Sequence, residues 1–407
     1  MLDQKTVEII KATVPVLAAR GVEITQHMYQ LMLTANSELA PFFNRANLRS
    51  NIQPLALARA LHAYAANIDN PGALAGAVEL IVNKHASLGV KPEHYTIVGT
   101  HLIQALKDVL MINDEQVEAW EKAYWFLADI CIDAERRLYH EAENQDGGWA
   151  GYRTFVLDKK VQESSVIASF YLKPKDAKKI ITFKPGQYVT IKFDFPGGNL
   201  VTRNYSLSDS SNGEYYRISV KKERRPLGEG QLPDGLVSCY LHDYYQPGME
   251  LQLRAPMGNF FLNHDTQRPV VLLSGGVGLT PMISMLNTIT ERYPKLETWF
   301  IHGALNRHTH AMRDHVKNLA SSTPNIHAYF CYSEPNPEDL REKTCDQTGL
   351  ITAEWLEGLL PHKDCDYYFC GPRPFMKMIF RILKLWDVPP TQICYEFFGP
   401  AGDIETP

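Results

Sequence analysis

The spacing of apolar residues changes twice along the chain of 407 residues, and these changes divide it into three segments. In residues 1–146, apolar side chains recur at helical spacing, as at Val7, Ile10 and Val14, which predicts successive α-helices. A polar stretch with two adjacent glycines, residues 144–149, then interrupts the pattern, as linkers do. The first segment is therefore expected to form an all-α domain.

The other two segments follow different patterns. In residues 147–262, short runs of alternating polar and apolar residues are separated by Pro/Gly turns, which predicts an antiparallel β-barrel or sandwich, of which we expect the barrel. In residues 263–407, β-rich runs alternate with helical stretches, which is typical of an α/β domain with a largely parallel sheet. A chain of this length can bury several separate cores, so we expect a multidomain protein with these three domains in this order.

Charge and cysteine content exclude several classes of protein. The net charge is -5 and no long basic run occurs, which argues against nucleic acid as a partner. The seven cysteines are odd in number and form no CxxC pair, so reduced thiols are expected rather than a disulfide framework, a zinc site or an iron–sulfur cluster. No signal-peptide core and no run of about 18 apolar residues occurs, so we expect a soluble cytoplasmic protein without stable membrane association.

A glycine-rich loop lies near the start of the third segment. The sequence VVLLSGGVGLTP, residues 270–281, runs from an apolar strand through this loop into a helix. Its glycines allow a phosphate to approach the backbone closely, and Pro281 suits the first turn of a helix, whose free N–H groups attract anions. The pattern is equally compatible with an ordinary tight turn, and Pro281 replaces the third glycine of the usual dinucleotide fingerprint. The candidate nucleotide contacts are Gly276, Val277, Gly278, Leu279, Thr280 and Pro281.

One histidine, His85, falls on the apolar face of a predicted helix together with Val78 and Ile81. Glu135 falls on the apolar stripe of the last helix of the segment, and Tyr95 begins a further stripe. Because buried polar groups need partners and an unpaired buried carboxylate is costly, these three polar side chains are expected to meet. A carboxylate on one imidazole nitrogen is the usual partner of a metal-bound histidine, so His85 is a candidate metal ligand. The alternative is a core histidine with satisfied hydrogen bonds.

The second segment contains the motif RNYS, residues 203–206, about one hairpin after PGQYVTIKF. With the glycine loop, these motifs resemble the ferredoxin–NADP reductase superfamily. The resemblance implies an FAD-binding barrel, with Arg203 on the pyrophosphate, Tyr205 against the isoalloxazine and Ser206 near the redox nitrogen of the flavin. It also implies that the helix start in GLVSCYLH receives the FAD phosphates. The implied FAD contacts are Tyr188, Arg203, Asn204, Tyr205, Ser206, Gly235 and Ser238.

The same resemblance extends to the end of the chain. It implies that the glycine loop binds the nicotinamide dinucleotide and that Cys370 and Gly371 of the CGP motif lie beside the nicotinamide. The choice between NADH and NADPH stays open, because Arg307 is compatible with a 2′-phosphate or with no role. The terminal YEFFGP motif is expected to cover the flavin, and its implied contacts are Glu396, Phe397, Phe398, Gly399 and Pro400.

The whole chain resembles the flavohaemoglobin family. The motifs APFFN and KHASLGVKPEHY in the first segment, GGW at the first joint and FFGP near the end follow the order found in that family. The resemblance implies a haem b in the first domain, with His85 as the proximal ligand of the iron. The other implied residues are Phe43 and Leu57 as haem contacts, Tyr29 and Gln53 on the distal side, Tyr95 and Glu135 behind His85, and Lys84 between haem and flavin.

The activity implied by this resemblance is that of a nitric oxide dioxygenase, in which NAD(P)H reduces FAD, FAD reduces the haem, and NO and O2 are converted to nitrate. Two alternatives stay open. One is a protein that binds or senses O2 or NO, and the other is an NAD(P)H-dependent reductase of another acceptor, such as hydroperoxides or ferric chelates. The apolar residues near Tyr29 and Leu57 are also compatible with a lipid or an azole-like ligand in the distal pocket. A monomer is expected.

Overall fold

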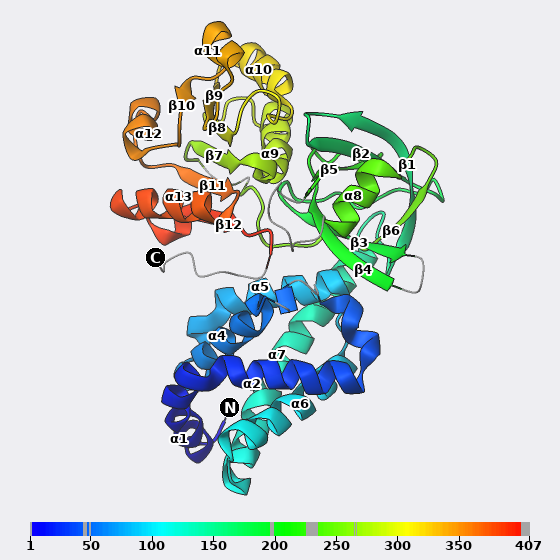
Figure 1. The fold of residues 1–407 in the computed structure, drawn as a ribbon, viewed down its shortest axis with the longest axis vertical. Helices are drawn as coiled ribbons and strands as arrows, with labels where there is room; N and C mark the ends of the chain where they lie inside the picture. Colours follow the sequence, from blue (N-terminus) through cyan, green and yellow to red (C-terminus); the bar gives the residue numbers. More distant parts are fainter. Residues whose placement is uncertain are drawn as a thin grey trace.

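The computed structural model describes residues 2–43, 47–48, 50–195, 199–224, 235–263, 265 and 267–399. Figure 1 shows three bodies that follow one another along the chain, in blue to cyan, in green, and in yellow-green to red. They are a helical domain, an antiparallel barrel and a domain built on a parallel sheet. The predicted order of fold classes is therefore confirmed, whereas the domain limits at residues 146 and 262 stay predictions.

The first body consists of helices around one core. Its elements are α1 (Gln4–Ala12), α2 (Val14–Ala35), η1 (Ser37–Phe42), α4 (Ile52–Ala66), η2 (Pro71–Leu74), α5 (Ala75–Leu88), α6 (Pro92–Leu110) and α7 (Asp114–Asn144). Side-chain caps fix two of the helix starts: Asp3 accepts a hydrogen bond from the Thr6 amide, and Asn113 caps α7 in the same way. The apolar faces of the helices meet around residues such as the fully buried Trp120.

The second body is a closed antiparallel barrel. Its elements are β1 (Arg153–Gln162), β2 (Ile167–Pro174), β3 (Tyr188–Phe195), β4 (Asn199–Ser206), β5 (Tyr216–Lys221), α8 (Leu236–Asp243) and β6 (Glu250–Leu253). The strand order is β4-β3-β6-β1-β2-β5. A bridge between Leu207, just after β4, and Ile218 of β5 brings the two edge strands together. Burial alternates along β6, where Leu251 and Leu253 are buried, as the alternating sequence pattern predicts. In β2, β3 and β5, by contrast, four or more consecutive residues are buried, so both faces of these strands are covered.

The third body has a parallel sheet with helices on its two faces. Its strands are β7 (Val270–Gly275), β8 (Thr298–Ala304), β9 (Ile326–Tyr332), β10 (Gln347–Thr348), β11 (Asp366–Cys370) and β12 (Ile393–Glu396). Its helices are η3 (Gly276–Gly278), α9 (Leu279–Arg292), α10 (Arg313–Ser322), α11 (Pro337–Glu342), α12 (Ala353–Leu359), α13 (Arg373–Leu385) and η4 (Pro390–Gln392). The order β10-β9-β8-β7-β11-β12 reverses direction between β7 and β11. In such sheets, ligands bind at the carboxyl ends of the strands beside the reversal.

The joint between the first two bodies is short and packed. Helix α7 ends at Asn144 and β1 begins at Arg153. Between them, Trp149 packs against Phe155, with 5.8 Å between the ring centroids, and its indole N–H donates to the Leu253 carbonyl at 3.3 Å. Among the described residues, no helix is long and apolar enough to cross a membrane.

Candidate functional site

Helices α5, α6 and α7 bring His85, Tyr95 and Glu135 together, as the spacing of the apolar residues predicts. The His85 Nδ1 atom lies 2.9 Å from the Tyr95 hydroxyl and 2.9 Å from Glu135 Oε1. The Tyr95 hydroxyl donates to Glu135 Oε1 at 2.5 Å. The Glu135 side chain is 3% exposed, so its charge depends on these two partners.

The donors in this cluster fix the form of the imidazole. Burial is the main cause that raises the pKa of Tyr95 far above its usual value, and the hydrogen bond to Glu135 is the second. The phenol therefore keeps its proton and donates a hydrogen bond to the carboxylate. The remaining acceptor sites of Glu135 then face Nδ1–H of His85. This assignment of the proton to Nδ1 leaves Nε2 with a free lone pair.

The His85 ring fits a haem iron. Among the described residues, both hydrogen bonds of the ring use Nδ1, and 35% of the side-chain surface is exposed. A neutral imidazole with a carboxylate on one nitrogen and a lone pair on the other is the form that binds a metal. Three buried residues of α5 and α7, Val82, Ala128 and Cys131, pack with Tyr95 in one apolar cluster.

A second polar group lies between α2 and α4. Gln53 Nε2 donates to the Tyr29 hydroxyl at 3.4 Å, and the Tyr29 ring meets Phe43 edge-on at 5.4 Å between centroids. Leu57, one helical turn after Gln53, packs partly buried against the same apolar core. Burial raises the pKa of Tyr29 to about 12, so its hydroxyl remains a donor at neutral pH. The structure therefore brings together Tyr29 and Gln53, predicted for the distal side, with Phe43, and places Leu57 against the same apolar core.

Lys84 lies where the three bodies meet. Its ammonium group is 5.6 Å from the ring centroid of Tyr188 in β3, and Glu396 at the end of β12 attracts it electrostatically. The Lys84 side chain is exposed, yet the surrounding protein desolvates its charge and lowers its pKa. Burial raises the pKa of Glu396 to about 7, against the opposing effect of Lys84. Figure 1 shows α5 on the side of the helical domain that faces the other two bodies.

Strand β4 carries a cation suited to a phosphate. The Arg203 guanidinium donates to the Thr202 carbonyl at 2.7 Å, and no acidic side chain in the described part of the chain forms an ion pair with it. Burial lowers the pKa of Arg203, which indicates a site that lacks a counter-charge. An anionic group such as a pyrophosphate supplies what this guanidinium lacks, so the residues fit FAD.

The neighbours of Arg203 line the same strand and connect it to the helical domain. Ser206 pairs with Tyr188 of β3, and burial raises the pKa of Tyr205. Asn204 accepts a hydrogen bond from Thr190 at 3.1 Å and donates to Ser87 of α5 at 3.4 Å. Asn204 therefore contacts the other domain rather than open solvent.

The start of α8 is partly satisfied by the protein itself. Ser238 Oγ donates to the Gly235 carbonyl at 3.1 Å and accepts from the Glu223 amide at 3.2 Å. Gly235 is the N-cap residue of α8 and supplies no side-chain cap, so the first amides of the helix remain available to an anion.

The glycine loop lies at the reversal of the parallel sheet. Gly276 adopts a φ of +55° with open space around it, which suits a close approach of a ligand. Gly278 has a different reason to be glycine, because a Cβ there would lie 2.7 Å from the Gly371 amide and closer still to the Cys370 carbonyl. The side chains of Leu279 and Thr280 are buried, as is Pro281, so these residues present only backbone groups to a nucleotide, and Val277 is partly buried.

The carboxyl end of β11 and the end of the chain complete this edge. Cys370 is fully buried, and burial raises its thiol pKa well above the usual value, so the group is a neutral thiol. Phe397 packs edge-on against Tyr395 at 5.8 Å between centroids, whereas Phe398 is 50% exposed. Gly399 follows with no other atom near its Cβ position, and Pro400 lies outside the described residues.

Arg307, the candidate for a 2′-phosphate, is bound to carboxylates. Its guanidinium donates to Glu342 at 2.7 Å and to Glu338 at 2.5 Å. These bonds direct the arginine toward α11 and place two negative charges beside it. The region after β8 therefore offers no free cation from Arg307 to the 2′-phosphate of NADPH.

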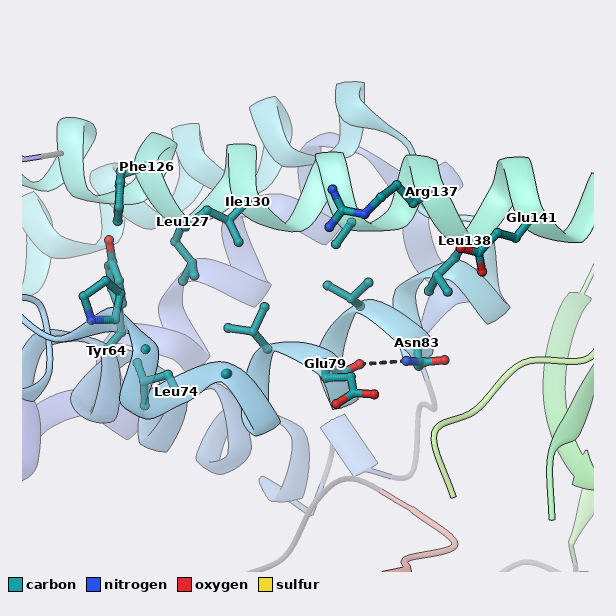
Figure 2. Close-up of a pocket in the computed structure, with 16 residues that line it drawn as sticks. Tyr64, Leu74, Glu79, Asn83, Phe126, Leu127, Ile130, Arg137, Leu138 and Glu141 are labelled. Atoms are coloured by element: carbon teal, nitrogen blue, oxygen red, sulfur yellow. Dashed lines mark hydrogen bonds between the residues drawn. The ribbon is translucent and has the colours of Figure 1, made fainter. Parts of the chain in front are cut away.

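A cavity of about 540 Å3 lies between α5 and α7 (Figure 2). Figure 2 shows Leu74 and Asn83 on the lower side and Leu127, Ile130 and Leu138 of α7 on the upper side. Its lining does not include His85, so it is separate from the predicted haem site. It nevertheless borders the helix turns that carry His85 and Glu135.

Several contacts between the domains are absent from the sequence-based predictions. Asn83 accepts a hydrogen bond from the Gly258 amide at 3.3 Å, and Ser87 accepts one from Asn204. Both lie on α5 beside His85. The sequence gives one signal for these contacts, which is position: Asn83 directly precedes Lys84, and Ser87 follows His85 by two residues.

Each of the three bodies matches a known protein family. The globin family matches residues 26–131, the oxidoreductase FAD-binding domain matches residues 154–262, and the oxidoreductase NAD-binding domain matches residues 272–381. These matches confirm the predicted cofactor set of haem, FAD and a nicotinamide dinucleotide and identify the chain as an oxidoreductase.

Full-length relatives carry the same arrangement. A flavohemoprotein from Bacillus cereus is 48% identical over 406 residues and covers 100% of both chains, and one from Halalkalibacterium halodurans is 46% identical, covering 99% of this chain and 98% of its own. The crystal structure of a flavohemoglobin from Malassezia yamatoensis with bound FAD and heme has a TM-score of 0.83 at 27% identity, covering 98% of this chain and 100% of that one. The FAD/NAD-binding domain of a nitric oxide dioxygenase from Vibrio cholerae has a TM-score of 0.54 at 35% identity, covering 61% of this chain and 99% of its own. The chain belongs to the flavohemoprotein family.

Proposed function

We propose that the protein is a nitric oxide dioxygenase that converts NO and O2 to nitrate with NADH or NADPH as reductant. The observation that carries the proposal is the place of α5, because this helix bears His85 and also docks on the barrel that bears Arg203. Lys84, one residue before His85, lies against Tyr188 of the barrel. A haem held by His85 is thereby next to a flavin reductase, which suits repeated reduction rather than storage of a gas.

When bound, the nicotinamide would supply hydride chemistry, the flavin a change from two-electron to one-electron transfer, and the haem the redox chemistry of O2 and NO. Each hydride carries two electrons, which suffice for the conversion of two NO and two O2 into two nitrate ions. The chain must therefore bind three cofactors, orient them and control the polarity around the iron.

On the proximal side, the roles fall to His85, Tyr95 and Glu135. Glu135 accepts a hydrogen bond from Nδ1–H of His85 and raises the basicity of Nε2, which would increase electron donation toward a bound iron. Tyr95 donates to the same carboxylate and holds it in place. Such electron donation would favour cleavage of a bond between two oxygen atoms of a haem ligand.

On the distal side, the roles fall to Tyr29 and Gln53. The hydroxyl of Tyr29 keeps its proton at neutral pH and is oriented by Gln53. A fixed donor in an apolar pocket stabilises negative charge that develops on an oxygen ligand. Phe43 and Leu57 supply the apolar walls around this donor.

In the reductase part, Arg203 and the N-terminus of α8 hold the FAD phosphates, and Tyr205, Ser206 and Tyr188 surround the flavin. The backbone of residues 276–281 and the β11 end at Cys370 and Gly371 position the nicotinamide dinucleotide. Two observations support these roles. Arg203 on β4 is a cation without an acidic partner among the described residues, and Gly276 forms an open turn where the strand order of the sheet reverses.

The test is NO consumption by purified protein replete with haem and FAD, supplied with NADH, with and without O2, while nitrate is measured. We expect rapid loss of NO that requires both NADH and O2 and yields one nitrate for each NO. Intact haem and flavin spectra without such turnover would refute the proposal and favour a protein that binds or senses O2 or NO. Oxidation of NADH with hydroperoxides or ferric chelates but not with NO would favour a reductase of another acceptor.

A further inference from the structure

We propose that Arg254 is a positioning residue that seats the C-terminal end of α5 on the barrel and so sets the distance and orientation between the flavin and haem sites. The inference rests on the proposed function, because it concerns the transfer of electrons between these sites. It assigns a role to a residue that belongs to neither the haem site nor the flavin site described above.

The contact is made at Gly89, the residue after α5. Gly89 has a φ of +82° and lies against the Arg254 guanidinium so closely that a Cβ at this position would come within 2.5 Å of Cζ and 2.8 Å of Nη2. Any other residue would therefore push the arginine away in addition to resisting the left-handed backbone. The glycine allows the barrel to contact the backbone of the helix end directly.

This helix end is the one that fixes His85. The Gly89 amide donates to the Ala86 carbonyl at 3.1 Å, and the Val90 amide donates to the His85 carbonyl at 3.0 Å. Together these bonds form a Schellman motif whose terminal acceptor is the backbone of His85. The Tyr139 hydroxyl of α7 donates to the Val90 carbonyl at 2.6 Å, so the turn is already held from within the helical domain. A shift of the turn would therefore be transmitted to His85.

Arg254 is in turn fixed on the barrel. Its amide donates to the Thr190 carbonyl of β3 at 2.9 Å, and its guanidinium lies 5.1 Å from the ring centroid of Tyr152, within reach of that residue's hydroxyl. A cation at the C-terminal end of a helix is stabilised by the partial negative charge of the last carbonyls. The guanidinium thus combines an aromatic contact on one side with a helix end on the other.

Besides the Lys84–Tyr188 contact and the packing of Ala86 in one apolar cluster with Tyr188 and Met257, two long hydrogen bonds join α5 to the barrel. The hydrogen bond from the Gly258 amide to Asn83 is 3.3 Å long, and the one from Asn204 to Ser87 is 3.4 Å long, near the upper limit for such bonds. Arg254 adds a charged contact one helical turn beyond His85. Its loss would leave the helix end without a charged contact to the barrel, held there by the packing of Ala86 and the long hydrogen bond of Ser87.

The experiment compares wild type, Arg254→Met and Arg254→Lys as holoproteins without O2. After mixing with NADH in a stopped-flow instrument, flavin and haem reduction are followed separately by absorbance. We expect Arg254→Met to reduce its flavin at the wild-type rate and its haem about tenfold more slowly, because misplacement of reacting groups by about 1 Å costs up to roughly 10²-fold in rate. Arg254→Lys should recover part of the loss. Small-angle scattering of Arg254→Met should show a larger radius of gyration.

Two further variants separate positioning from a general loss of structure. Gly89→Ala disturbs the same contact from the helical side and should also slow haem reduction selectively, and the double variant Gly89→Ala/Arg254→Met should be no slower than the slower single variant. Lys175→Met, which removes an exposed lysine paired with Glu250, should match wild type. Wild-type rates and scattering in Arg254→Met would overturn the inference, as would equal slowing of flavin and haem in both single variants. A wild-type protein that reduces its haem but forms no nitrate would instead refute the proposed function and leave this inference standing.

Discussion

The substitution Glu135→Gln tests the arrangement behind His85, because it removes one charge and almost no volume. The carboxylate accepts hydrogen bonds from Tyr95 at 2.5 Å and from His85 Nδ1 at 2.9 Å in a nearly solvent-free site. A hydrogen bond to a charged group contributes about 1.5–3 kcal/mol, and one between neutral groups about 0.5–1.5 kcal/mol. The bond to His85 should therefore weaken by about 1–1.5 kcal/mol.

If this bond supports the chemistry at the iron as proposed, its weakening lowers the rate of nitrate formation about tenfold, since about 1.4 kcal/mol corresponds to a factor of ten. The haem should remain bound, and its amount is measured after conversion to the pyridine complex. The iron–histidine stretching frequency of the ferrous protein, measured by resonance Raman spectroscopy, should fall because the imidazole becomes less basic.

Tyr95→Phe is the matched control, because it removes a hydrogen bond from the cluster and keeps the charge of Glu135. It should change the stretching frequency and the nitrate rate less than Glu135→Gln does. Loss of haem from Glu135→Gln would show that this residue has a structural role. An unchanged frequency together with an unchanged nitrate rate would refute the reasoning.

Three other predictions concern the distal side, the nucleotide and the domain junction. Tyr29→Phe should lower nitrate formation by roughly 10²-fold, as loss of one fixed donor does elsewhere, and leave anaerobic haem reduction unchanged; equal nitrate rates in the two proteins would contradict the role of the hydroxyl. The ratio of kcat/KM values should favour NADH over NADPH, because Arg307 is bound to Glu338 and Glu342, and a preference for NADPH would show that the arginine leaves these carboxylates. The pKa of Glu396, raised to about 7 by burial, predicts that the native state binds more protons than the unfolded state between about pH 4.5 and 7, so stability should fall as pH rises through this window. Denaturant unfolding of Glu396→Gln should show less of this decrease, and an identical pH dependence would exclude Glu396 as its source.

The cluster around His85 was predictable because each of its polar members interrupts an apolar stripe at helical spacing. The three stripes belong to helices that pack together, and the cost of an unpaired Glu135 leaves few other solutions. The order of the three fold classes was also predictable, because apolar residues recur about every 3.6 residues in helices and every second residue in half-buried strands.

The contacts between domains were not predictable from such patterns. Arg254 follows a strand in which side chains alternate between core and solvent, and nothing local shows that a neighbouring domain covers it. The glycine at Gly89 is expected at the end of a helix, yet its contact with a guanidinium depends on how the two bodies dock. Gly278 shows the same limit within one domain, because its close neighbour Cys370 is far away in the sequence.

The packed joint around Trp149 has a consequence for the kinetics of the whole molecule. Electron donor and acceptor belong to one chain, and the indole is fixed to the Leu253 carbonyl and the Phe155 ring, so the partners do not have to find each other by diffusion. Tethering of this kind replaces a bulk concentration by a constant effective concentration. The exchange between the two halves should therefore be a first-order event that is insensitive to dilution.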